Sequence, residues 1–164
     1  MKVSALEEYG LRCMILLAKN SENGEALSLT EISAREGFSV PYAGKLLMIL
    51  RKGGLVTSER GRQGGYFLAR PPEEIRLKDI FDALGEPLFG AGHCERHAGG
   101  KENCVHHEDC TVQHIWNSFD RFINGILKNI SLADLAGGNR HLVKSLRKSM
   151  DKIEYTELNL EKTK

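Results

Sequence analysis

The residue types best suited to chemistry lie together near the middle of the chain. Three of the four cysteines are found there, accompanied by four histidines: Cys94, Cys104, Cys110, His93, His97, His106 and His107. Thiolates and imidazoles are the ligands that zinc and iron–sulfur clusters take in proteins. An odd number of clustered cysteines does not fit a disulfide framework, so the segment predicts a metal or redox site.

The spacing of these ligands leaves the metal open. Three thiolates are one ligand short of the four that zinc or cluster iron usually takes. Cys94 with His97 and Cys104 with His107 also make a Cys₂His₂ set. Structural zinc that only orders the loop is therefore an alternative to an iron–sulfur cluster, and three unliganded thiols are another. Because the chain has no nucleophile-elbow motif, we expect neither an enzyme nor a small-molecule substrate.

Three predicted helices precede this segment. Apolar residues recur at helical spacing over residues 4–19, 29–36 and 41–52. Pro41 suits the first turn of the third helix because its missing N–H is not needed there. Two short helices joined by a tight turn that contains glycine are typical of a helix-turn-helix unit. The candidate N-caps are Ser4, Ser28 or Thr30, and Ser39 or Val40.

A β-hairpin is predicted directly after the third helix. Two short candidate strands, residues 55–59 and 66–69, flank a loop at residues 60–65 that contains three glycines. A helix-turn-helix unit followed by a hairpin makes a winged helix. The predicted fold class is therefore mainly α with a small β-hairpin wing.

Local charge makes this region a candidate reader of DNA. The whole chain has 23 Lys and Arg against 22 Asp and Glu, a net charge of +1, so attraction to nucleic acid must come from local clustering. Between residues 43 and 70, Glu59 alone opposes the basic residues, which are Lys45, Arg51, Lys52, Arg60, Arg62 and Arg70.

A single helix fits the DNA major groove, which is about 12 Å wide. We expect the first turns of the third helix to meet base edges, its last residues to lie near phosphates, and the hairpin loop to enter the minor groove or contact its backbone. A winged helix that binds protein is the alternative. The predicted DNA contacts are Pro41, Tyr42, Ala43, Gly44, Lys45, Arg51, Lys52, Arg60, Arg62 and Gln63.

The second half of the chain predicts a dimer. A wide apolar stripe recurs at helical spacing from Thr111 to about Ile130, which suits a coiled-coil-like seam between two copies. The expected organisation is a winged helix-turn-helix domain at residues 1–84, a cysteine-rich cluster-binding loop at 85–110, a dimerisation helix with a C-terminal helical segment at 111–152, and a polar tail at 153–164 that frays.

Neither a membrane span nor a leader is predicted. The apolar runs fall far short of the roughly 20 residues that cross a bilayer, and the N-terminus has no long apolar stretch ending in a small-residue cleavage site. The sequence therefore predicts a cytoplasmic protein with no membrane partner.

Several of these segments resemble the Rrf-two family of bacterial transcription regulators, the IscR- and NsrR-like group. The resemblance covers roughly residues 1–137, and the hairpin segment is its most specific part. It is carried by Ser4–Tyr9 with Leu11 and Arg12, Leu29–Ile32, Gly54–Ser58, Arg60 with Gly61, Gly64–Ala69, Ile75–Ala83, the three clustered cysteines and Ser131–Leu135.

This resemblance implies a homodimer that binds a pseudo-palindromic double-stranded DNA operator. It also implies a [2Fe-2S] or [4Fe-4S] cluster held by Cys94, Cys104 and Cys110 with a fourth, non-cysteine ligand. Glu8 occupies the position of one such ligand, which comes from the partner subunit, and His114 is displaced by one residue from the position of another.

Two departures from the family pattern leave the cluster type, the fourth ligand and the zinc alternative open. The gap between Cys94 and Cys104 is longer than in several members, and Arg12 stands where a redox-switching member has histidine. The sequence thus predicts a repressor or dual regulator whose DNA binding depends on a cluster that senses redox state, nitric oxide or iron–sulfur status.

Overall fold

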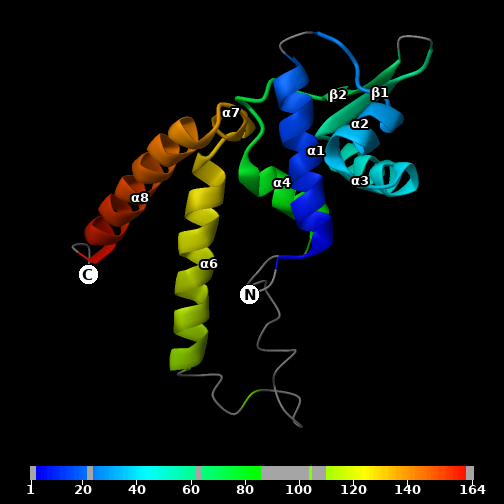
Figure 1. Cartoon of the computed structure of the whole chain (residues 1–164). Coiled ribbons are helices and arrows are strands. Elements are labelled where there is room, and N and C mark those ends of the chain that lie inside the picture. The colour runs from blue at the N-terminus through cyan, green and yellow to red at the C-terminus, as the bar shows by residue number, and fades with distance from the viewer. Residues whose placement is uncertain (1–2, 22–23, 62–63, 86–103, 105–109, 162–164) are drawn as a thin grey trace.

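The chain folds into helices and one small antiparallel hairpin (Figure 1), which confirms the predicted fold class. The computed structural model describes residues 3–21, 24–61, 64–85, 104 and 110–161. Along these residues the elements are α1 (Ala5–Ser21), α2 (Leu29–Glu36), α3 (Val40–Lys52), β1 (Val56–Glu59), β2 (Gly65–Leu68), α4 (Leu77–Leu84), α6 (Thr111–Asn129), α7 (Leu132–Ala136) and α8 (Asn139–Glu161).

Side chains next to the helix starts fix several of the boundaries. At α1 the Glu7 amide donates to Ser4 Oγ at 3.2 Å, and the Ser4 amide donates to Glu7 Oε2 at 2.7 Å. The same reciprocal pattern joins Ser28 to Glu31 at α2, so Ser28 rather than Thr30 is the cap. These bonds satisfy amide N–H groups that have no partner inside the helix, so each start is encoded locally.

The turn of the helix-turn-helix unit is stabilised by the backbone conformation of a glycine and by contacts between aromatic rings. Gly37 ends α2 with φ +76°, a conformation that side-chain-bearing residues rarely adopt. Beyond it, the rings of Tyr9, Phe38 and Tyr42 meet edge to face with centroids 5.6–5.8 Å apart. This cluster packs α1 against the turn and against the first turn of α3.

The hairpin is joined to the body by a third extended segment. Strands β1 and β2 pair from Val56 with Leu68 to Glu59 with Gly65. Leu27 then pairs with Tyr66, because each amide donates to the other's carbonyl, at 3.2 and 2.9 Å. The predicted wing is confirmed, and it is attached to the chain just before α2.

One apolar core joins α1, α3, α4 and the chain that follows α6. Leu47 and Ile80 are fully buried, and so is Leu132, while Ile130 is 1% exposed. Backbone bonds bring this later segment into place, since the Leu77 amide donates to the carbonyl of Ile130 at 2.9 Å. Helix α7 and the last turn of α6 therefore belong to the same body as the winged helix.

The two long helices extend from this body (Figure 1). Helix α6 packs partly on α4 and α8, and it contains no buried residue. Helix α8 reaches Glu161, so the expected helix end at residue 152, with a frayed tail beyond it, was wrong. The Glu and Leu residues of the stretch 153–161 favour helix despite its polar composition. No helix in the described part of the chain is both long and apolar enough to span a membrane.

Candidate DNA-binding surface and metal-binding segment

One face of α3 is open to solvent and basic. Lys45 and Lys52 are exposed there, and Met48 between them is 49% exposed. Pro41 continues the same face by one more turn. The spacing of three and four residues places all four side chains in one row along the helix, which suits a helix lying in a groove with cations beside the phosphates.

Ala43 does not belong to that face, and its prediction as a base contact was wrong. Its exposed fraction is 0%, because it shares the buried side of α3 with Leu46, Leu47 and Leu50. Tyr42 is half-buried and its ring packs with Tyr9 and Phe38. Packing against the core decides which side of α3 is buried. The local sequence did not reveal which side this would be.

Met48 is a candidate contact that the sequence analysis missed. It lies three residues after Lys45 and four before Lys52, and that spacing was the available signal. Its apolar side chain can contact the methyl group of thymine in the major groove. Gly44 is half-buried and faces α2, where a Cβ atom would lie 4.0 Å from Leu29 Cδ1.

The remaining predicted contacts lie at the end of α3 and on the wing. The Arg51 Nη1 group donates to Ser58 Oγ at 3.1 Å, so this arginine also ties α3 to β1. Arg60 is exposed where β1 ends, next to Gly61 with φ +127°. Arg62 and Gln63 lie outside the described residues, so their contact with DNA stays a prediction.

The structure describes all of the predicted metal ligands except one. Cys110 caps α6, with its Sγ accepting from the Gln113 amide at 3.4 Å, and His114 is exposed one turn later. Cys104 is half-buried, Glu8 is exposed on α1, and Cys94 lies outside the described residues. Among the residues that the structure describes, no group of three or more His, Cys, Asp or Glu is arranged to hold a metal.

The donor chemistry of this segment nevertheless fits a cluster. Cys104 and Cys110 are free thiols, which suits ligation by thiolate. The Gln113 N–H at the start of α6 donates to Cys110 Sγ, and such hydrogen bonds to a ligand sulfur are part of how proteins tune clusters.

Cys13 is chemically separate from the clustered cysteines. It is fully buried on α1, as predicted for a small core residue. Burial raises the pKa of its thiol to about 12, and the carboxylate of Glu36 adds to the rise. Because only the thiolate is a good ligand or nucleophile, Cys13 is inert in the folded protein.

The helix-turn-helix unit, its basic third helix and the attached hairpin define a winged helix-turn-helix DNA-binding protein. The chain belongs to the Rrf2 family: the family model, described as an iron-dependent transcriptional regulator, matches residues 3–138. It is thus a DNA-binding transcriptional regulator and not an enzyme. This assignment favours DNA over the alternative of a winged helix that binds only protein.

Relatives and solved structures agree with this assignment. IscR of Serratia proteamaculans is 34% identical over 151 residues, which cover 92% of this chain and 88% of that protein. The IscR structure from T. potens has a TM-score of 0.65 at 34% identity, covering 82% of this chain and 85% of that one. CymR, the global cysteine regulator of B. subtilis, has a TM-score of 0.68 at 30% identity, covering 84% and 97%.

Proposed function

We propose that this regulator is a homodimeric, cytoplasmic repressor or dual regulator whose operator binding is controlled by an iron–sulfur cluster. The cluster would be held by Cys94, Cys104 and Cys110, with Glu8 of the other subunit or His114 as the fourth ligand. The position of Cys110 carries the proposal, because this residue ends the cysteine segment and is also the N-cap of α6.

The dimer is supported by the apolar face of α6. Four large apolar side chains on it are exposed in the single chain, at spacings of three, four and three residues: Val112 at 61%, Ile115 at 47%, Phe119 at 45% and Phe122 at 40%. This a/d spacing is that of a coiled-coil seam. We call these four residues the α6 seam. A second copy packed on it would remove the exposed apolar surface from water.

The ligand set supports a switch rather than a purely structural metal. When bound, the cluster would supply iron that reacts with oxidants or nitric oxide. A carboxylate or imidazole from Glu8 or His114 matches cluster iron less well than the thiolates do, so it is the ligand that would leave first.

Two paths lead from these ligands to the DNA-binding surface. Without a bound metal, Cys110 and the start of α6 lose a covalent tether, which would change how the α6 seam pairs. Glu8 lies one turn of α1 before Arg12, whose Nε donates to Glu36 Oε2 at 2.8 Å at the end of α2, just before the turn that leads to α3. In a dimer the two α3 helices must address grooves about 34 Å apart, so a small rotation at either place would cost affinity.

The first experiment is the composition of protein purified without oxygen. The proposal predicts brown protein that contains iron and acid-labile sulfide, and loss of both in Cys104→Ala. Glu8→Ala and His114→Ala then identify the fourth ligand by which of them destabilises the cluster toward oxygen. Colourless protein with stoichiometric zinc, or with no metal, would instead support the structural-zinc or thiol-only alternative.

A further inference from the structure

A positively charged pocket lies where α4, α6 and α8 meet. Its volume is about 360 Å³. Figure 1 shows α8 on one side of α1, with α3 and the hairpin on the other. The pocket is therefore separate from the predicted DNA-reading helix. It is lined by Arg76, Lys128, Asn129, Asp134, Ser145, Lys148, Ser149 and Lys152.

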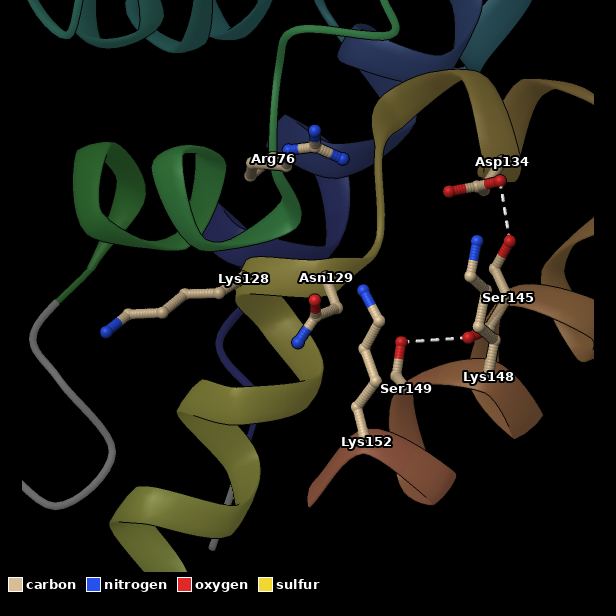
Figure 2. Close-up of a pocket in the computed structure, with 8 residues that line it drawn as sticks. All are labelled: Arg76, Lys128, Asn129, Asp134, Ser145, Lys148, Ser149 and Lys152. Atoms are coloured by element: carbon tan, nitrogen blue, oxygen red, sulfur yellow. Dashed lines mark hydrogen bonds between the residues drawn. The ribbon is translucent and has the colours of Figure 1, made fainter. Parts of the chain in front are cut away.

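The cationic side chains come from different elements (Figure 2). Arg76 stands at the start of α4 and points toward the pocket, and Lys148 and Lys152 reach into it from α8. The ammonium group of Lys128 turns away from the others. Neither Arg76 nor Lys148 forms an ion pair with any residue that the structure describes.

Among the lining residues that the structure describes, the one carboxylate, Asp134, already accepts several hydrogen bonds. Asp134 Oδ2 accepts from the amide and hydroxyl of Ser131 at 2.9 and 2.8 Å, and Oδ1 accepts from Ser145 Oγ at 2.6 Å. Partial burial raises the pKa of Asp134, but these hydrogen bonds and, to a smaller extent, the positive charge of Arg76 outweigh it and lower the pKa below its ordinary value. Asp134 therefore stays ionised, and its one negative charge does not balance the two positive charges of Arg76 and Lys148.

The walls of the pocket are held in place by the fold. The backbone of Arg76 pairs with that of Ser131, which fixes the start of α4 against the end of α6. Ser149 is 2% exposed, and its hydroxyl donates to the Ser145 carbonyl at 2.8 Å. A site on such rigid elements loses little conformational entropy when a ligand binds.

We infer that this pocket binds a small oxyanion with two or more negative charges, such as a phosphomonoester or a dicarboxylate. The planar guanidinium of Arg76 matches paired oxygens of phosphate or carboxylate, and Lys148 adds a point charge. The volume is that of a small-molecule site. The bound anion would join α8 to the winged body and to the last turn of α6.

Direct binding to the full-length protein tests this inference and needs neither an operator nor a cluster. Isothermal titration at constant ionic strength uses inorganic phosphate, glycerol 3-phosphate and succinate as probes, with chloride as the background anion. Binding of either phosphate, of succinate, or of both supports the site and identifies the preferred group. Binding of none of the three overturns the inference.

Matched variants then locate the site. Lys148→Gln should weaken anion binding about tenfold, since a charge-assisted hydrogen bond is removed. Lys144→Gln, on the same helix but outside the pocket, should change it by less than about twofold. Equal affinities in the two variants overturn the proposal. It is also overturned if Lys148→Gln weakens binding to mixed-sequence duplex DNA while leaving anion binding unchanged, because the pocket would then serve the DNA backbone.

Discussion

The guanidinium of Arg12 on α1 donates twice to Glu36 at the end of α2. Its Nε lies 2.8 Å from Glu36 Oε2, and its Nη2 lies 2.9 Å from the Glu36 carbonyl oxygen. The same guanidinium lies 5.3 Å from the centroid of the Tyr9 ring. These contacts attach α1 to the turn that sets the position of α3.

Removing this attachment should affect operator binding more than stability. Arg12→Ala is expected to cost about 1 kcal/mol of unfolding free energy, since the pair is partly exposed. Operator affinity should fall further than this small loss explains, because the turn before α3 is released. Urea unfolding and fluorescence anisotropy measure the two effects. Arg35→Ala, an exposed arginine on α2, is the control, and equal behaviour of the two variants would argue against this role.

The wing should contribute through charge. Arg60→Ala and Arg62→Ala should each weaken DNA binding, and the slope of log affinity against log salt should shrink by about 0.9 for each phosphate that is no longer neutralised. If one of them reads a base instead, discrimination between operators should fall by about 1–3 kcal/mol with little change in slope. Arg140→Ala on α8 is the control. Unaltered binding in both wing variants would remove the wing from the interface.

The local signals in the sequence predicted the helix starts and the wing well. The bonds at Ser4 and Ser28 join residues three positions apart, so the sequence contains both partners. The buried side of α3 could not be read in the same way. Ala43 and Met48 are both compatible with either face, and only packing against α1 and α4 decides which one is buried.

Contacts between residues far apart in the chain could not be predicted from the local sequence patterns. Arg12 and Glu36 are 24 positions apart, and nothing in the spacing of either helix pairs them. The return of Ile130 and Leu132 to the core of the winged body was equally hidden, because their apolar character also suited the dimer helix. The ligand set is predicted by residue type, while its arrangement depends on Cys94, which lies outside the described residues.

The α6 seam should hold the dimer together. Ile115→Glu places a charge in the middle of the seam, and burying an unpaired charge is costly, so the dimer dissociation constant should rise by about a hundredfold or more. Asn117→Glu, on the opposite side of α6, should leave the dimer intact. Sedimentation equilibrium measures both, and a dimer that survives Ile115→Glu would place the interface elsewhere.

The thiols should differ sharply in reactivity. With the pKa of Cys13 raised to about 12 by burial, its thiolate fraction at pH 8 is only about one in ten thousand. Iodoacetamide should therefore label Cys104 and Cys110 in the folded metal-free protein and leave Cys13 unmodified until urea is added. Mass spectrometry of the peptides checks this, and fast labelling of Cys13 in the folded state would contradict its placement in the core.

The state of the cysteine segment should control DNA binding, and on this coupling the proposed function depends. The most direct measurement compares anaerobic cluster-loaded protein with Cys104→Ala on an operator selected from random duplexes, after circular dichroism has shown that the variant is folded. We predict that the two affinities differ by about tenfold or more, a coupling of ordinary size for an allosteric protein. Equal affinity of the variant and a fully loaded parent would contradict this coupling.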